Sequence, residues 1–389
     1  MLAIRLAFKN LRAAGLRTWL AAAVLSIAFV VMVFYNGLLD GWNLQARNDT
    51  RAWEIGGGQY WHPQYDRFDP FSLQEAHALL APPVQQRVAA GELAPVLIVP
   101  ATAYPDGRMI NVQLKGIAAD QRILALPTGF FRSDSAELPA LIGRRMAASL
   151  KLKSGDEMLV RWRDRNGVFD AREITIAHIF SANVPAIDNG QIWLPLDRLQ
   201  ALTGLENQCT LLIAAAEQPA PPLPGWNWRP PALLLKEYEE VIQAKKAGSG
   251  ILYGLLFAIA LLAIFDTQVL AIFRRQREIG TLMALGMTRG QVIRLFTVEG
   301  SVHSLLALFL AALYGLPLLA WLGRHGITMP EVADATGMTI SATLIPVYSL
   351  SLLLVSVALV IVSAAIVSYL PARRIAQMKP TEALKGRAM

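Results

Sequence analysis

Cysteine and histidine are scarce in this sequence of 389 residues, and several familiar catalytic motifs are missing. Cys209 is the single cysteine, so no disulfide can form within the chain and the fold depends on its own apolar core. The dipeptide Gly-Lys does not occur, and the five histidines are scattered with no His-Glu-x-x-His motif. These absences argue against a P-loop ATPase, a histidine metal site and a disulfide-stapled module.

Carboxylate pairs suited to general acid and base chemistry are also lacking. The pair Asp66/Asp69 lies in a polar loop and the pair Glu239/Glu240 on a polar helix face, where solvation explains both. No Gly-x-Ser-x-Gly motif is present. We therefore expect no catalytic, cofactor-binding or metal-binding residue on this chain and no enzyme activity of its own.

Long apolar runs are what the chain has in abundance. Hydrophobic residues make up 54% of it, and the mean hydropathy is positive. Four runs are nearly free of charge and long enough to cross a hydrocarbon core of about 30 Å as helices. The sequence therefore predicts a membrane protein with a large α+β domain, 40–250, inserted between the first and second of four transmembrane α-helices, at 18–39, 251–272, 301–322 and 344–368.

Lysine and arginine set the orientation of these spans. Basic residues gather in the amphipathic leader 1–17, the connector 273–300 and the tail 369–389, whereas the turn 323–343 carries mixed charge. Because positive segments stay in the cytosol, we expect both termini inside and the inserted domain outside. The net charge of +7 belongs to these membrane edges, where it meets anionic lipid, and not to a nucleic-acid surface. No small-x-small cleavage signal follows the first run, so we expect an uncleaved anchor.

The inserted domain is expected to mix helices and strands between two helical stalks. The first stalk is predicted at 36–51, followed by a flexible hinge at the glycine triplet 56–58, and the second stalk at 234–246. Ser72, with Glu75 three residues on, is typical of a capping box and predicts the start of a helix. The apolar pattern predicts helices at 138–152 and 196–202, and strands at 94–99, 109–114, 157–163, 173–180, 191–194 and 210–214.

The connector 273–300 is basic, amphipathic and punctuated by glycines. A segment of this length does not fold into a domain, but it can lie along the membrane surface and be gripped by another protein. Arg289 and Arg294 suit acidic groups on a partner or lipid head groups, and glycines at 280, 286 and 290 allow a sharp reversal into a short helix. The alternative is a basic loop at the membrane surface that only determines the orientation of the transmembrane helices. The apolar contacts are expected from Ile279, Leu282, Met283, Val292, Ile293 and Phe296.

Two features inside the apolar runs leave alternatives open. Asp266 is the one carboxylate well within a run, and an ion pair with Arg274 or Arg275, or a hydrogen bond within the bundle, explains it better than proton coupling. The spacing Gly250-x-x-x-Gly254 permits close approach of helices, so it marks either a dimer face or a flexible joint.

Short motifs in the connector and tail occur together in a specific order. They are Arg277-Glu278-Ile279-Gly280, Ala284-Leu285-Gly286, Gln291-Val292 and Glu299-Gly300, then Pro371-Ala372-Arg373-Arg374 and Pro380-Thr381-Glu382-Ala383-Leu384. With them the chain resembles the FtsX/MacB-type permeases of ATP-binding-cassette (ABC) systems, also called type VII or mechanotransmission transporters. In the insert, VQLKGI at 112–117, LIG at 141–143 and LKLKSGD at 150–156 resemble the family's periplasmic core domain.

The resemblance implies a pair of permeases, identical or paralogous, above a separate ABC ATPase dimer in the bacterial inner (cytoplasmic) membrane. ATP and magnesium would be bound by the ATPase and not by this chain. The inserted domain would be periplasmic, and the connector would contain a coupling helix seated in a groove of the ATPase. The residues expected to meet the ATPase are Glu278, Gly280, Leu285, Gly286, Met287, Arg289, Gln291 and Arg294.

The layout narrows the resemblance further. MacB-like exporters often carry the ATPase on the same chain, for which little sequence remains outside the four spans, and FtsX has a smaller outer domain. The chain is therefore most similar to LolC/LolE-like lipoprotein-releasing permeases, which implies extraction of a lipoprotein or other amphiphile and its transfer to a periplasmic acceptor. Alternatives are tripartite efflux of small molecules or peptides with an adaptor, and FtsX-like regulation of a cell-wall hydrolase. The expected apolar access surface for cargo, for which ordinary helix packing is the alternative role, comprises Phe34, Tyr35, Leu38, Trp42, Ile251, Tyr253 and Leu255.

Overall fold

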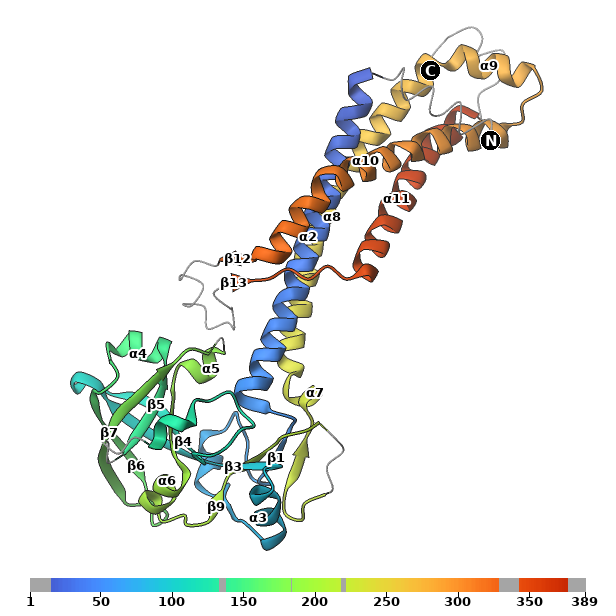
Figure 1. Ribbon diagram of the computed structural model, residues 1–389. Coiled ribbons are helices and arrows are strands. Elements are labelled where there is room, and N and C mark those ends of the chain that lie inside the picture. Colours follow the sequence, from blue (N-terminus) through green and yellow to red (C-terminus); the bar gives the residue numbers. More distant parts are fainter. Residues whose placement is uncertain (1–14, 133–137, 183, 218–221, 329–342, 377–389) are drawn as a thin grey trace. The chain divides into compact units, whose positions relative to one another are not determined.

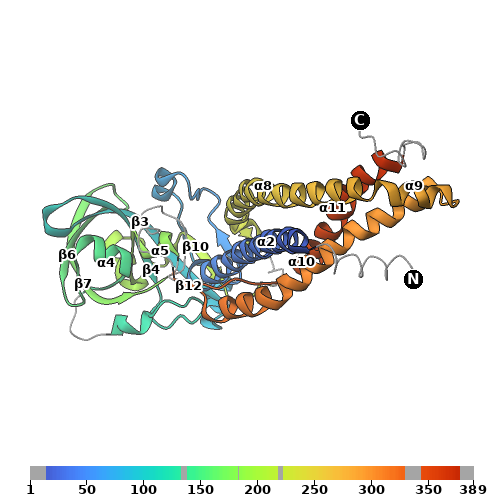
Figure 2. The ribbon, with the colours of Figure 1, turned by 90° about the horizontal axis from the view of Figure 1, so that it is seen from above.

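The chain divides into two units, seen from two directions in Figures 1 and 2. Unit 1 comprises residues 1–42, 241–327 and 344–389, and unit 2 comprises 43–240 and 328–343. Residues 1–14 of the predicted leader, most of the turn 323–343 and the end of the tail lie outside the described residues. The computed structural model describes residues 15–132, 138–182, 184–217, 222–328 and 343–376.

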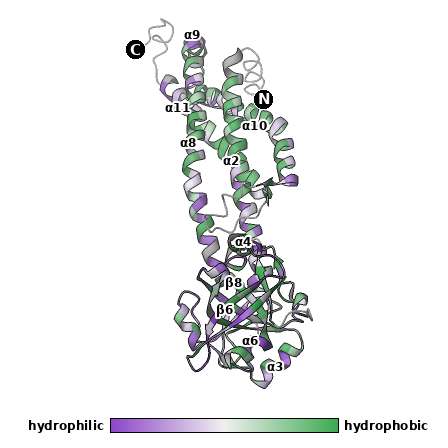
Figure 3. Cartoon of the chain, turned by 90° about the vertical axis from the view of Figure 1, so that its left-hand side faces the viewer, coloured by the Kyte–Doolittle hydropathy of each residue, from purple (hydrophilic) through white to green (hydrophobic). Residues whose placement is uncertain are grey.

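Unit 1 is a bundle of long helices. Among the described residues, four helices are long and apolar enough to cross a membrane, as the sequence predicted, and Figure 3 shows them as mostly hydrophobic. All four contribute to one buried apolar cluster, with Leu25, Phe257, Ala311 and Val360 among its members. The last turns of α2 and the first residues of α8 belong to unit 2. The helices are α2 (Gly15–Thr50), α8 (Lys236–Arg274), α10 (Arg289–His325) and α11 (Leu350–Ala376), with the short α9 (Gln276–Ala284) between α8 and α10.

The fourth membrane helix begins later than the predicted residue 344. α11 starts at Leu350, because Pro346 and the residue before it favour an extended backbone. The Val347 N–H donates to the backbone oxygen of Gly37 in α2 at 2.9 Å. The segment before α11 therefore runs along α2 as extended chain instead of adding a turn to the helix.

Unit 2 is built around a nine-stranded sheet with the order β11-β1-β10-β3-β4-β8-β5-β7-β6. Strand β3 pairs with β4 along one edge, while along its other edge the first residues pair with β10 and the last with β6. Strands β3, β4, β8, β5, β7 and β6 therefore close into a small barrel. Apolar side chains from all six strands form one core, with Leu97, Leu114, Trp162 and Ile192 among them.

The strands of this sheet and the short helices around it have the following bounds. The strands are β1 (Gln59–Trp61), β3 (Leu93–Tyr104), β4 (Ile110–Ile117), β5 (Pro139–Gly143), β6 (Glu157–Arg163), β7 (Phe169–Phe180), β8 (Gln191–Pro195), β10 (Leu211–Ala214) and β11 (Asn227–Arg229). The helices are α3 (Pro82–Ala89), α4 (Arg144–Leu150), α5 (Pro185–Asp188), α6 (Leu196–Thr203) and α7 (Pro231–Leu234), with the single turns η1 (Arg51–Ile55), η2 (Pro70–Gln74), η3 (Pro105–Gly107) and η4 (Thr128–Arg132).

Two further strand pairs are short. β2 (Ala78–Leu79) pairs with β9 (Gln208–Cys209), and β12 (Ile327–Thr328) pairs with β13 (Thr343–Leu344). Cys209 is fully buried in β9, and this burial raises the pKa of its thiol above the ordinary value.

Most of the predicted elements of the insert are confirmed, and two are wrong. The six predicted strands correspond to β3, β4, β6, β7, β8 and β10, and the helix predicted at 196–202 is α6. The helix predicted at 138–152 is instead the strand β5 followed by the short α4, and all five β5 residues are buried. The helix expected from Ser72 is the single turn η2, which Asp69 caps by accepting the Phe71 N–H at 2.9 Å. The second stalk is split at Leu235, between α7 and α8.

The glycine triplet after the first stalk packs tightly against neighbouring strands, so the prediction of a flexible hinge there is wrong. The Gly57 N–H donates to the Ala214 oxygen at 2.7 Å, and the Ala214 N–H donates back to the Gly58 oxygen at 2.9 Å. Gly58 adopts a φ of +131°, and a Cβ there would overlap the Trp228 ring. Glycine is required at this position because the chain passes close to β11 and the end of β10.

Candidate functional site

The connector between α8 and α10 consists of α9, a tight turn and the start of α10. Gly286 occupies the turn with a φ of +100°, a backbone conformation that favours glycine. Thr288 then caps α10, since its side chain accepts the Gln291 N–H at 3.3 Å and the Gln291 side chain accepts the Thr288 N–H at 2.9 Å. Gly280 and Gly290 lie inside α9 and α10, so the reversal predicted for them is wrong.

This cap moves the start of the third membrane helix well ahead of the predicted residue 301. α10 runs unbroken from Arg289 to His325. The second half of the connector and the third apolar run therefore belong to one helix, which contains Pro317. A force applied at the turn before Arg289 would act directly on that helix.

Apolar side chains on the inner face of the connector are already used within the chain. Ile279, Val292 and Phe296 are at most 2% exposed and pack with Ala372 of α11. Met283, Met287 and Ile293 are partly buried against the same cluster, and Leu282 is half-buried. The sequence predicted contacts from these residues, and the structure directs the buried ones toward α9, α10 and α11 instead of toward a partner.

Arg275 connects the start of α9 to α10. Its Nη1 donates to both carboxylate oxygens of Glu299, at 2.9 and 3.0 Å, and its Nε donates to Glu278 at 2.7 Å. The guanidinium also lies 5.3 Å from the centre of the Phe296 ring. Partial burial opposes the charge, but Glu278 and Glu299 outweigh it and raise the pKa of Arg275 above its ordinary value. This ion pair was not predicted from the sequence.

Buried polar side chains lie behind the connector, between α8, α10 and α11. The Nδ1 of His303 is 3.3 Å from both the Gln268 side-chain nitrogen and the Glu299 backbone oxygen, so it accepts from the first or donates to the second. A Cβ on Gly300 would overlap the Ser368 side chain. These residues were missed, although isolated polar residues within apolar runs are a signal that could have found them.

The outer face of the connector carries most of the residues predicted to meet an ATPase. We use the name exposed turn for Leu285, Gly286, Arg289 and Arg294, which are all exposed, with Leu285 at 80%. Two of the other four predicted residues are exposed but already have partners: Glu278 accepts from Arg275, and the Gln291 side chain accepts from the Thr288 N–H. The remaining two are Met287, which is half-buried, and Gly280, which is buried.

Asp266 does not form the predicted ion pair. Its side chain is exposed on α8, beside a shallow hollow lined by apolar residues of α2 and α8, and within the described residues it has no ion pair. Arg275 is turned to Glu278 and Glu299 instead, and Arg274 is exposed. A carboxylate that faces hydrocarbon is costly, so Asp266 would be stabilised by a polar or cationic partner.

The residues predicted as a cargo access surface fall into two groups. Trp42 is buried, with the Lys245 ammonium 4.1 Å from its ring centre, and Phe34 and Tyr253 pack against the core of the bundle, as ordinary helix packing requires. An ion pair between Asp40 and Lys246 joins α2 to α8 beside them. Tyr35 and Leu38 are half-buried, and only Ile251 and Leu255 are strongly exposed, at 78% and 61%.

Comparison with known proteins supports one family. Residues 250–380 match the model of a family described as FtsX-like permease C-terminal. No curated protein matches the chain. The matched region contains the exposed turn, the Arg275–Glu299 ion pair and three of the four long apolar helices. The match supports the resemblance of this chain to the FtsX/MacB-type permeases. Members of that family are membrane proteins that serve as the permease component of ABC transporters and are generally non-catalytic.

Proposed function

We propose that this chain is the permease subunit of an ABC transporter whose separate ATPase dimer binds the exposed turn. The observation that carries the proposal is the arrangement of the connector. Its apolar face is buried within the chain, while Leu285, Arg289 and Arg294 remain exposed at the end of a continuous membrane helix. A projecting apolar residue flanked by two cations suits an acidic groove on a partner.

The same arrangement suggests how motion passes from the ATPase to the bundle. Thr288 caps α10 next to the turn, and Arg275 holds α9 against α10, so the connector and α10 move together. Under this proposal ATP and magnesium act on the partner, and this chain contributes no catalytic group. Its task is to convert movement of the turn into movement of its helices.

The cargo we propose is a lipoprotein or another amphiphile, taken from the inner membrane and passed to a periplasmic acceptor. Exposed Ile251 and Leu255 on α8 would contact its acyl chains, close to the Asp40–Lys246 ion pair. Both termini would be cytosolic and unit 2 periplasmic, as the positive charge of the connector suggests. Asp266, exposed on α8, would meet a second permease, identical or paralogous, because lipid offers a carboxylate no partner.

Co-purification tests the ATPase contact. The full chain would be expressed with each separate ABC ATPase of the same genome in turn, and the complex isolated in lipid nanodiscs. We expect Leu285→Asp and Arg289→Glu to reduce retention of the ATPase at least tenfold. Arg172→Glu, the same charge reversal at an exposed position of unit 2, should retain it as the wild type does. Full retention by both connector variants would refute the docking surface.

ATPase stimulation then tests the cargo. The wild-type complex in nanodiscs would receive a triacylated lipoprotein, the same protein without its acyl chains, or an adaptor protein of a tripartite pump. Stimulation by the acylated form alone supports extraction of a lipoprotein. Stimulation by the adaptor alone would contradict the cargo proposed and favour efflux, while leaving the ATPase contact intact.

A further inference from the structure

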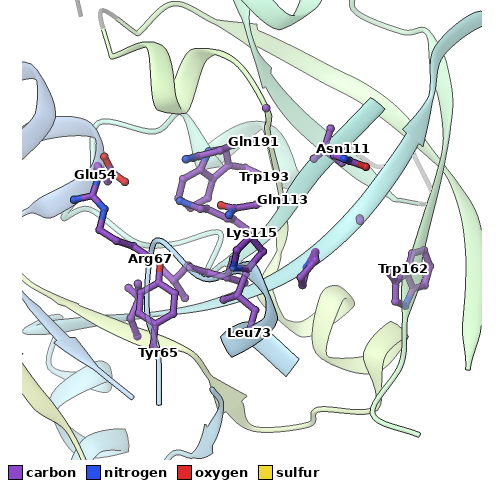
Figure 4. Close-up of a pocket in the computed structure, with 18 of the residues that line it drawn as sticks. Glu54, Tyr65, Arg67, Leu73, Asn111, Gln113, Lys115, Trp162, Gln191 and Trp193 are labelled. Carbon is purple, nitrogen blue, oxygen red and sulfur yellow. The ribbon is translucent and has the colours of Figure 1, made fainter. Parts of the chain in front are cut away.

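Unit 2 contains a cavity of about 650 Å³ on the face of the sheet formed by β3, β4 and β8. Alternating residues of these strands line it, including Ile98 of β3, Lys115 of β4 and Trp193 of β8. Lys115 and Trp193 are direct partners in the parallel β4–β8 pairing, so their side chains emerge side by side. Tyr65 and Leu73 of the loop after β1 also line the cavity, and Figure 4 shows them beside Lys115.

Lys115 is the unusual member of this lining. Its side chain is only 6% exposed, and within the described part of the chain this side chain makes neither a hydrogen bond nor an ion pair. Its ammonium lies 5.3 Å from the centre of the Trp193 ring, a contact that offsets only part of the cost of burial. Burial lowers the pKa of Lys115, an effect that Arg67 adds to and Glu54 opposes. An anion next to such a buried amine would stabilise its charged form.

Three more polar atoms of the lining are buried and have no hydrogen-bond partner within the described residues. They are the indole nitrogen of Trp193, the side-chain oxygen of Gln191 and the hydroxyl oxygen of Thr50. Gln191 precedes Trp193 on the same face of β8 and is itself 6% exposed. Unsatisfied buried polar groups are rare in folded proteins. The Lys115 amine and the Trp193 N–H are donors that one anion would satisfy, whereas the Gln191 oxygen is an acceptor and needs a donor.

The rest of the lining defines the ligand. Besides Lys115, the lining carries three cationic side chains and one anionic side chain, namely Arg67, Arg161, Arg163 and Glu54. This excess of positive charge favours an anionic ligand. Apolar and aromatic side chains share the walls with amide and hydroxyl side chains, and the volume lies in the range of small-molecule sites. The lining residues that would contact an apolar body are Trp61, Leu73, Val96, Ile98, Leu211 and Ile213.

We propose that this cavity binds a small amphiphile with an anionic head group, held by the Lys115 ammonium and the Trp193 indole N–H. The apolar body of the ligand would lie along Ile98 and Leu73. This inference stands on unit 2 alone and does not depend on the ATPase contact proposed for unit 1. It gives unit 2 a ligand-binding role in addition to any mechanical one.

Calorimetric titration with matched probes tests the site. The full chain in phosphatidylcholine nanodiscs would be titrated with indole-3-acetate, indole-3-acetamide and tryptamine, which share one ring system and differ in charge. We expect the wild type to prefer the anion at least tenfold over the other two. Lys115→Met should weaken binding of the anion at least tenfold and leave the amide unchanged, whereas Lys153→Met, at an exposed lysine of unit 2, should bind as the wild type does.

Trp193→Phe gives a second variant that keeps an aromatic ring at this position and the charge of Lys115. It should weaken binding of the anion severalfold through loss of the N–H donor and of part of the ring, and near-wild-type unfolding temperatures would confirm that both variants fold. Failure of the wild type to bind the anion above empty nanodiscs, equal binding of tryptamine, or undiminished binding by both variants would overturn the proposal. Repeating the titration with phosphatidylglycerol in the nanodisc separates two sources of ligand: competition identifies a lipid head group, and unchanged affinity a soluble anion.

Discussion

Removal of the Glu299 carboxylate tests how firmly α9 is fixed to α10. Arg275 reaches both oxygens of Glu299, and the two side chains are 25% and 13% exposed. Breaking a buried ion pair from one side costs about 3–5 kcal/mol. Because Arg275 is partly solvated and keeps Glu278, we expect a smaller loss for Glu299→Gln, about 1–3 kcal/mol.

Hydrogen exchange read by mass spectrometry measures this loss where it occurs. In nanodiscs the amides of α9 should exchange about 5- to 150-fold faster in Glu299→Gln, the factor that corresponds to 1–3 kcal/mol. Glu278→Gln is a matched control, since it breaks the other bond to the same arginine at a side chain that is 62% exposed. A surface pair is worth about 0–1 kcal/mol, so that change should speed exchange by a factor of about five at most.

The double variant Arg275→Gln/Glu299→Gln tests whether the unpaired charge of Arg275 causes the loss of protection in α9. It removes the partly buried charge that Glu299→Gln leaves without its main partner, so α9 should regain part of its protection. Equal exchange in Glu299→Gln and Glu278→Gln would show that the buried contact does not hold α9. A double variant less protected than Glu299→Gln would show that Arg275 stabilises α9 by packing instead of by charge.

Three further predictions concern packing and pH. Gly300→Leu should lower the thermal unfolding temperature of the micelle-solubilised protein, because the new side chain overlaps Ser368; an unchanged temperature would contradict the close packing of α10 on α11. Gly58→Ala should cost unit 2 about 2–4 kcal/mol in urea unfolding followed by tryptophan fluorescence. Gly91→Ala, with a positive φ but nothing within 4 Å, should cost about 1 kcal/mol, and equal costs would refute the steric argument. Between the lowered pKa of Lys115 in the folded chain and its ordinary value of about 10.4, the unfolded chain binds one more proton. The free energy of unfolding should therefore rise with pH in that window, and urea unfolding at a series of pH values should show a flatter rise for Lys115→Met.

The four membrane helices and most strands were predictable because hydropathy and period-two alternation are local properties. β6 has the predicted bounds, and its buried and exposed residues alternate without exception. β5 was missed because all five of its residues are buried, and an uninterrupted apolar run does not distinguish a strand from a buried helix. The start of α10 was misplaced because the span was placed by hydropathy, while the helix is set by the Thr288 cap.

The candidate site was predictable in its location but not in its contacts. Periodicity marked Ile279, Val292 and Phe296 as one apolar face, but it does not show whether that face packs within the chain or against a partner. The Arg275–Glu299 pair joins residues on different helices, and only the fold brings them together. Lys115 falls on the polar side of an alternating strand, which predicts exposure, and the loop that covers it comes from much earlier in the chain.

Cys209 is both the single cysteine of the sequence and fully buried, which makes the protein convenient for site-specific labelling. Its sulfur is fully buried, and the raised pKa of the thiol keeps it protonated and unreactive at neutral pH. Because the chain contains no other cysteine, the natural protein already serves as an unreactive background for maleimide chemistry. A single cysteine introduced at exposed Leu285 or Leu262 would carry a spin label or fluorophore at that site alone. Distances between labels on two copies would then report movement of the turn or of α8 without any core residue having been changed.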